Sequence, residues 1–215
     1  MKIKLFVFSI IALGLSFAAG VFVYKSNETR LSESQTPMNQ EILVRPYSRI
    51  YGSPDVRVTI VEFINPTCGT CATFTPIAKQ MVADNPGKIR LVLRYAGTKP
   101  EVVKALSMLE AAGLQGKYDQ TLELMFKGMD MWAPNHTVKL KMLEKLLATL
   151  ELNMDRLKTD MNDTELLSRI NQDNADAAML NARKTPAFFV NGRPLETFGR
   201  EELEKLVRSE LDAQY

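Results

Sequence analysis

The chain has 215 residues, of which 46% are hydrophobic and 24% are charged, and its formal net charge is +2. This is the composition of an ordinary globular protein that is long enough to bury a core without disulfide bonds. Because the sequence has no long basic run, it gives no indication of a nucleic-acid partner.

The first 25 residues are typical of a membrane-targeting segment. Lys2 and Lys4 precede residues 5–24, which carry no charge and which as a helix would be about 30 Å long, enough to cross a bilayer. The segment is either an uncleaved anchor or a signal peptide cleaved after small residues. The apolar residues 21–23, which continue past the possible cleavage site, favour the anchor. Both interpretations keep Lys2 and Lys4 in the cytoplasm and place the rest of the chain on the exported side of the membrane.

A polar stretch follows the apolar segment, and a folded domain is expected after it. Residues 26–41 are polar and of mixed charge, which predicts a linker. The expected domain comprises residues 42–215. At its boundary with the linker, residues 41–45 predict a short strand. Residues 56–64 are β-branched and nearly continuously apolar, which predicts a buried central strand.

The rest of the chain predicts an α/β fold with a helical insertion. A helix from Gly69 to about Asp84 and a strand over 88–96 complete a strand–helix–strand unit. Helical spacing of apolar residues then dominates over residues 101–115, 117–126, 137–150 and 164–182. Strands return over 186–196, with a hairpin turn at Asn191–Gly192, and a last helix follows over 200–213. The pattern predicts one mixed sheet, interrupted by an all-helical insertion over about 97–183.

The two cysteines, Cys68 and Cys71, are separated by Gly69 and Thr70. A haem attachment site would need a histidine at position 72, where this chain has alanine, and a zinc site would need more than the single histidine. A structural disulfide closing so short a loop would constrain the unfolded chain little. Redox exchange explains the placement better. A thiolate at a helix N-terminus is stabilised by free backbone N–H groups and by the helix dipole, and Cys71, one turn later, can resolve a mixed disulfide.

Over residues 42–215 the chain resembles the DsbA-like exported thiol–disulfide oxidoreductases of the thioredoxin-fold superfamily. The resemblance rests on a helical insertion of DsbA-like length and on four motifs, namely Cys68-Gly69-Thr70-Cys71, Glu62 six residues before it, Pro76 in the following helix, and Thr185–Pro186 before a strand. It implies a thioredoxin fold, catalytic roles for Cys68, Cys71 and Glu62, and Gly69 and Thr70 as the residues that tune the active-site motif.

The resemblance also implies roles for the residues outside the motif. Glu62 would be a buried acid with a raised pKa that exchanges a proton with Cys71. Thr185 and a cis Pro186 would leave backbone groups free to pair with an extended substrate peptide. Pro76 would kink the active-site helix. Without the resemblance, Glu62 could face solvent on an alternating strand, and Pro186 could be trans at a strand start.

We therefore expect disulfide exchange with protein substrates, regeneration by a membrane or exported redox partner, and no metal or organic cofactor. The direction of electron flow stays open, although the absence of a histidine between the cysteines weakens the case for a very strong oxidant. The alternative is a Cu(I)-binding protein or metallochaperone that uses the same cysteines with Met125, Met129 and Met131. Packing is the simpler interpretation of these methionines beside Trp132, and a loop position is the simpler interpretation of His136.

Overall fold

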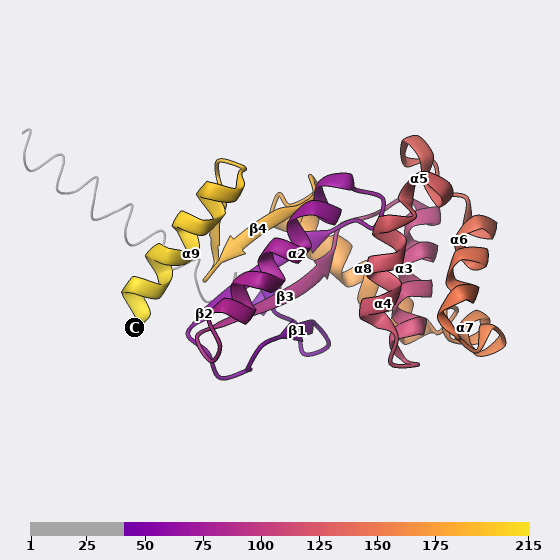
Figure 1. The fold of residues 1–215 in the computed structure, drawn as a ribbon, viewed down its shortest axis with the longest axis horizontal. Helices are drawn as coiled ribbons and strands as arrows, with labels where there is room; N and C mark the ends of the chain where they lie inside the picture. The colour runs from indigo at the N-terminus through magenta and orange to yellow at the C-terminus, as the bar shows by residue number, and fades with distance from the viewer. Residues whose placement is uncertain (1–40) are drawn as a thin grey trace, which may run out of the picture. The chain divides into compact units, whose positions relative to one another are not determined.

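The computed structural model describes residues 41–215, of which Leu43–Tyr215 form one compact unit. In this part of the chain five strands form one sheet in the order β1-β3-β2-β4-β5 (Figure 1). The strands are β1 (Arg49–Tyr51), β2 (Val58–Ile64), β3 (Ile89–Tyr95), β4 (Ala187–Val190) and β5 (Arg193–Pro194). Strands β2 and β3 are parallel, and the other three pairings are antiparallel. This is the mixed sheet that the sequence predicts.

The helices fall into two groups by position in the sequence. Helices α2 (Gly69–Asp84) and α9 (Arg200–Gln214) follow strands of the sheet, whereas α3 to α8 lie between β3 and β4. That inserted block comprises α3 (Pro100–Gly113), α4 (Tyr118–Lys127), α5 (Met129–Trp132), α6 (Leu140–Leu147), α7 (Met154–Asp160) and α8 (Thr164–Met179), with 3₁₀ turns η1 (Pro134–His136) and η2 (Ala148–Leu150). In Figure 1, α3 to α7 stack beside one end of the sheet.

Strand β2 is central because both of its faces are apolar. Ile60 and Ile64 pack in the larger core cluster with side chains of α2 and α9, whereas Val61 and Phe63 pack in a second cluster that includes Ala177 of α8. The alternation of a strand sends successive side chains to opposite faces. Helices α2 and α9 therefore cover one face of the sheet and α8 covers the other.

Two details of the expected elements are wrong. Residues 41–43 are helical and residues 44–48 form turns and bends, so the expected strand over 41–45 is absent, and β1 follows instead at Arg49–Tyr51. Leu43 and Val44 look like part of a strand, but they pack against the core cluster on the α8 face of the sheet. The strand that pairs with β3 at this edge is β1. The insertion also holds α7, a short helix that the break near residue 153 concealed. Asn153 caps α7 by accepting a hydrogen bond from the amide of Arg156.

A buried ion-pair network fastens α8 to the sheet. The guanidinium of Arg94, on β3, is 0% exposed and donates to Asp173 at 2.8 Å and to Asp176 at 2.6 Å, both on α8. It also donates to the carbonyl of Leu43 at 2.9 Å. Arg45 forms a second ion pair with Asp176 at 2.7 Å. The network thereby holds the last helix of the insertion and the start of the domain against the same strand.

Replacing Arg94 with methionine is expected to lower the free energy of unfolding by about 3–5 kcal/mol, because the buried Asp173 would lose its ion pair and the buried Asp176 would keep only its pair with Arg45. Urea denaturation measures the change. The matched control is Arg156→Met, which removes an exposed pair with Asp160 on α7 and should cost less than about 1 kcal/mol. Equal losses in the two variants would contradict a stabilising role for the buried network.

Candidate functional site

A hydrogen-bonded turn delivers Cys68 to the start of α2. After β2 ends at Ile64, the side-chain carbonyl of Asn65 accepts hydrogen bonds from the amide and the hydroxyl of Thr67, both at 2.9 Å. The amide of Cys68 donates to the main-chain carbonyl of Asn65 at 3.0 Å. These bonds fix the backbone between strand and helix, so that Cys68 occupies the N-cap of α2.

The sulfur of Cys68 takes the place of an oxygen cap. With φ −101° and ψ 112°, Cys68 has the extended backbone of an N-cap, and its Sγ accepts from the amide of Cys71 at 3.4 Å. Gly69 and Thr70 are exposed, and a Cβ on Gly69 would meet nothing within 4 Å. The two intervening residues therefore leave Cys68 open to an incoming sulfur.

The pKa of Cys68 is lowered to about 5. The largest cause is the hydrogen bond from the Cys71 thiol, and the Thr185 side chain and the backbone amides of Cys71 and Thr70 add to it against the opposing effect of burial. In the thiol form Cys68 lies 3.2 Å from the carbonyl oxygen of Thr185, to which it donates. At neutral pH Cys68 is therefore a thiolate, which is the nucleophilic form.

Cys71 has the opposite character. It is 0% exposed, and burial raises the pKa of its thiol far above the ordinary range, with further contributions from its hydrogen bond to Cys68 and from the charge of that thiolate. Both cysteines are free thiols in this structure. The pair is thus divided into one reactive thiolate at the surface and one protonated thiol beneath it.

Glu62, on β2, is a buried acid beside this pair. It is 0% exposed, and its Oε1 accepts a hydrogen bond of 2.8 Å from the hydroxyl of Thr75 on α2. Burial raises the pKa of Glu62 from 4.5 to about 8, although Thr75 and Lys79 oppose the shift. The charge of Glu62 in turn raises the pKa of Cys71. The alternative of a solvent-facing residue does not apply.

Thr185 and Pro186 lie where the resemblance places them, beside Cys68. The peptide bond between them is cis, and β4 begins at the next residue. Pro76 lies inside α2, which continues through it to Asp84. The structure thus brings together Cys68, Cys71, Glu62 and Thr185 from three separate stretches of the sequence.

Sequence reasoning missed two partners of this site. Thr75 lies four residues after Cys71, so helical spacing alone could have placed it on the same inward face. His136 lies in η1, and its Nδ1 is 3.0 Å from the carbonyl oxygen of Thr67, directly before Cys68. No local signal in the sequence connects a turn of the insertion with the active-site loop.

The methionines that were expected either to pack in the core or to bind copper lie partly in the core and partly at the surface. Met125 is fully buried, and its carbonyl accepts from the indole of Trp132 at 2.8 Å, whereas Met131 is 56% exposed. Over residues 41–215 no three His, Cys, Asp or Glu side chains are grouped in a way that could hold a metal ion. Packing therefore accounts for Met125.

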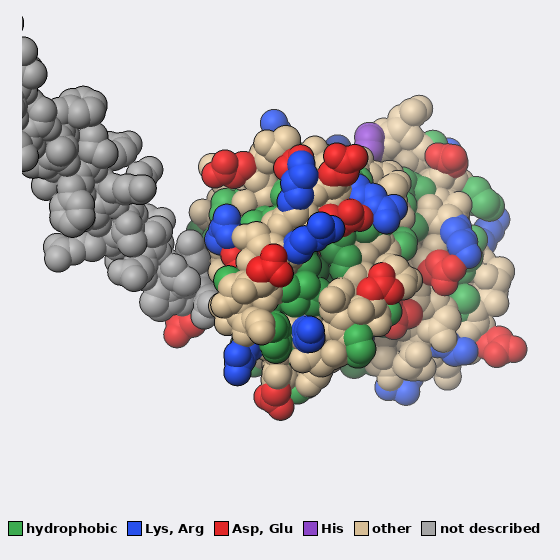
Figure 2. Space-filling view, turned by 60° about the vertical axis from the view of Figure 1, so that its left-hand side comes forward, with side chains coloured by type: hydrophobic (Ala, Val, Ile, Leu, Met, Phe, Trp, Pro, Cys, Tyr) green, Lys and Arg blue, Asp and Glu red, His purple; other side chains and the backbone are tan. Residues whose placement is uncertain are grey.

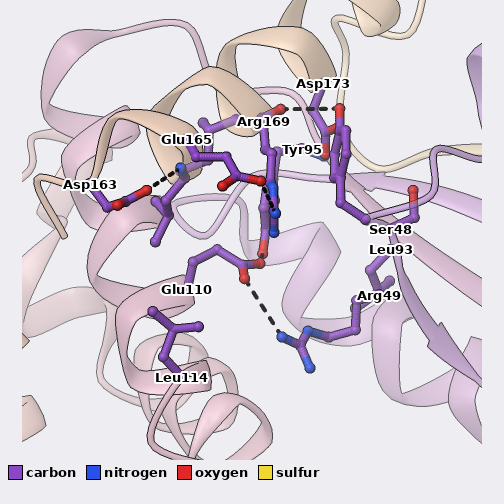
Figure 3. A pocket seen from close by; sticks show the side chains of 13 residues that line it. Ser48, Arg49, Leu93, Tyr95, Glu110, Leu114, Asp163, Glu165, Arg169 and Asp173 are labelled. Carbon is purple, nitrogen blue, oxygen red and sulfur yellow. Dashed lines mark hydrogen bonds and ion pairs between the residues drawn. The ribbon is translucent and has the colours of Figure 1, made fainter. Parts of the chain in front are cut away.

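A cavity of about 230 Å³ lies apart from the cysteines, between β1, β3, α3 and α8 (Figure 3). The polar side chains that line the cavity bind one another or neighbouring side chains. Tyr95 donates to Glu110, Arg49 lies 3.6 Å from Glu110, and Asp173 belongs to the buried network of Arg94. None of its lining residues belongs to the cysteine motif or to the Thr185–Pro186 loop. We therefore assign the chemistry to the cysteine site.

Comparison with known proteins agrees with this geometry. The sequence profile of the family described as Thioredoxin matches residues 45–209. The chain belongs to this thioredoxin family.

Among relatives, it is 29% identical over 179 residues to the Na⁺/H⁺ antiporter NhaA of Herminiimonas arsenicoxydans, with 82% of this chain and 28% of the antiporter covered. It is 24% identical over 198 residues to RP025 of Rickettsia prowazekii, a candidate protein-disulfide oxidoreductase, with 89% and 71% covered. The chain therefore spans about a quarter of the antiporter's length.

Solved structures show the same DsbA-like fold. Alpha-DsbA1 of Wolbachia pipientis superposes with a TM-score of 0.70 at 20% identity, over 82% of this chain and 96% of that one. A thioredoxin-like oxidoreductase from Silicibacter pomeroyi gives 0.67 at 24% identity, over 81% and 98%. BdbD of Bacillus subtilis gives 0.64 at 18% identity, over 77% and 93%. The thioredoxin fold with its helical insertion is thus confirmed.

Replacing Glu62 with glutamine is expected to stabilise the protein increasingly as pH rises. In the unfolded chain the carboxyl ionises at its ordinary pKa, whereas the folded protein keeps its proton up to about pH 8. The wild type therefore loses stability between about pH 4.5 and 8, at up to about 1.4 kcal/mol per pH unit, and Glu62→Gln lacks this loss. Denaturation of both proteins across this range measures the difference.

The matched control is Glu165→Gln, at an exposed glutamate on α8 that pairs with Arg169. Its stability relative to the wild type should change little over the same pH range. A flat difference for Glu62→Gln as well would show that Glu62 titrates normally and is not the buried acid described above.

Proposed function

We propose that the chain is an exported thiol–disulfide oxidoreductase that exchanges disulfides with protein substrates through Cys68 and Cys71. The observation that carries the proposal is the division of the pair into an accessible low-pKa thiolate and a buried thiol. Thioredoxin family membership and the DsbA-like fold support it. The exchange requires only these two sulfurs, so we propose no metal or organic cofactor.

The reaction proceeds through a mixed disulfide. In one direction the Cys68 thiolate attacks a substrate disulfide, a new S–S bond forms, and the released substrate thiolate takes up a proton. Cys71 then gives its proton to the ionised form of Glu62, the minor form near neutral pH, and attacks the sulfur of Cys68, which releases the second substrate thiol. An acid with a pKa of about 8 can accept and return a proton near neutral pH. The opposite direction runs the same steps backwards and oxidises the substrate.

We propose the oxidising direction for the chain. Stabilising the Cys68 thiolate stabilises the reduced state of the pair, and a stabilised reduced state makes the disulfide a stronger oxidant. The stabilisation comes from Cys71, Thr185 and the amides of α2. A histidine between the cysteines is therefore not required for it.

We propose that the domain works on the periplasmic side of the membrane, either anchored by residues 5–24 or released after their cleavage. That segment lies outside the described residues, and no helix over residues 41–215 is long and apolar enough to span a bilayer. Support comes from relatives in which the matching domain is part of a chain named as a Na⁺/H⁺ antiporter. A membrane or exported redox partner would regenerate the disulfide. N-terminal sequencing of the mature protein separates anchor from signal peptide.

An aromatic surface next to the cysteines is suited to hold an apolar substrate side chain. Phe74 lies on α2 three residues after Cys71, and its ring centroid is 4.6 Å from that of Phe198 and 6.1 Å from that of Phe188 on β4. Phe198 is 49% exposed. Elsewhere, the face in Figure 2 intersperses acidic and basic side chains, so charge selects no obvious partner there. We propose that unfolded protein segments bind at Phe198.

The copper alternative gains no support from the described residues. The lowered pKa of Cys68 and the burial of Cys71 are explained by disulfide exchange, and no third ligand of the His, Cys, Asp or Glu class lies with them. No observation therefore favours Cu(I) binding as a second function.

The cysteine variants test the proposed chemistry. Cys71→Ser should trap mixed disulfides with protein substrates, because the attacking thiolate remains and the resolving thiol is gone, whereas Cys68→Ser should form none and lose exchange activity. Non-reducing electrophoresis and the reduction of a test disulfide measure both outcomes. Full exchange activity in Cys68→Ser would refute the mechanism.

Replacing Phe198 with serine should raise the KM for an unfolded protein substrate by about 5- to 20-fold, which corresponds to roughly 1–2 kcal/mol of lost apolar contact. The rate with a small thiol such as dithiothreitol should not change, because the cysteines are intact. Met179→Ser removes a similarly exposed apolar side chain, 65% exposed at the end of α8, and should change neither rate. An unchanged KM for Phe198→Ser would place substrate binding elsewhere.

A further inference from the structure

His136 reaches the active-site loop from the helical insertion, 68 positions after Cys68 in the sequence. Its Nδ1 lies 3.0 Å from the carbonyl oxygen of Thr67. Because a carbonyl oxygen can only accept, Nδ1 carries a hydrogen and donates it. The side chain is otherwise exposed (Figure 2, purple). The sole histidine of the chain thus holds the peptide group that leads directly into Cys68.

The turn that carries His136 is firmly anchored. Trp132, two residues before η1, is 0% exposed, and its carbonyl accepts a hydrogen bond of 2.6 Å from the amide of Lys139, which follows the turn. Asn135 and His136 have φ values of 50° and 59°, in the left-handed region, which asparagine and histidine adopt more readily than most non-glycine residues. The backbone of this turn places the His136 ring beside the carbonyl of Thr67.

The Thr67 carbonyl gets its donor from outside its own turn. Asn65 accepts from the amide and the hydroxyl of Thr67 and from the amide of Cys68. The bonds within the turn therefore satisfy the donors of Thr67 and Cys68, and His136 satisfies the carbonyl of Thr67. The peptide between Thr67 and Cys68 is fixed from both sides, which sets where the sulfur of Cys68 can lie.

We propose that His136 is a positioning residue for Cys68, through which the helical insertion helps to set the reactivity of the attacking thiol. The inference rests on the proposed function only in taking Cys68 as that thiol. The groups that act directly on Cys68 are Cys71, Thr185 and the amide of Thr70, with the buried Glu62 behind them. All of them depend on the sulfur staying at the N-cap. Without its bond to His136 the Thr67 peptide can rotate and move the sulfur away from these donors.

Three variants test the proposal. Each introduces glycine or asparagine, which tolerate the positive φ of positions 135 and 136. In His136→Asn, a side-chain nitrogen keeps a donor at the place of Nδ1, whereas His136→Gly has no donor. Asn135→Gly, the matched control, loosens the same turn and leaves His136 in place. The pKa of Cys68 is read from the ultraviolet absorbance of its thiolate, and the rate of attack on a small disulfide is measured in parallel.

We expect His136→Gly to raise the pKa of Cys68 by about half a unit, which is the low end of what one hydrogen bond contributes. Near pH 5, where the wild-type thiol is half ionised, the rate of attack should then fall about twofold. His136→Asn and Asn135→Gly should keep the pKa and the rate of the wild type. This pattern would assign the effect to the hydrogen bond rather than to the flexibility of the turn.

An unchanged pKa in His136→Gly, or an equal shift in Asn135→Gly, would overturn the proposal and leave His136 a structural residue of its turn. Should the glycine variant fail to fold, His136→Asp replaces it. That side chain also tolerates a positive φ, but it can only accept, so an unchanged pKa of Cys68 there would equally overturn the proposal. Absence of thiol exchange in the wild-type protein would instead refute the proposed function.

Discussion

The position of the Cys68 sulfur at the N-cap of α2 is the constraint on which the site depends, because there the thiol of Cys71, the largest cause of the lowered pKa, and the amide of Cys71, at 3.4 Å, both act on it. A helix N-terminus has backbone N–H groups without partners and a positive dipole end, and here a sulfur occupies the capping position. Placing the first cysteine at the cap makes it acidic, and placing the second one turn later buries it. One local geometry therefore creates both the nucleophile and the resolving thiol.

The rest of the fold serves to keep that helix end in place. Strand β2, apolar on both faces, holds the Asn65–Thr67 turn at its carboxyl end, and β4 brings Thr185 to the other side of the sulfur. Glu62 is the one polar side chain on this face of β2, between the apolar Ile60 and Ile64. From this buried position its carboxyl can exchange a proton with Cys71. On the opposite face Arg94 fastens α8, so the insertion is held firmly enough for η1 to reach the active-site loop.

Much of this arrangement could be predicted from the sequence where the signal is local. The start of α2 at Gly69 follows from the cysteine motif after a buried strand, and Asn191–Gly192 forms the expected turn, with φ values of 49° and 86°. The burial of Glu62 follows from its apolar neighbours. The expected strand over 41–45 is wrong because apolar composition does not tell which segment reaches the edge of β3. The contact of His136 with Thr67 depends on how the insertion packs, which no sequence spacing encodes.

The reduction potential of the Cys68–Cys71 pair, measured by equilibration with glutathione, tests the central claim most directly. If the N-terminus of α2 stabilises the Cys68 thiolate as described, the reduced state is favoured and the potential should lie towards the oxidising end, near about −120 mV. A potential near about −270 mV would mean that the reduced state gains little from the thiolate. That result would contradict both the stabilisation at the helix end and the oxidising direction.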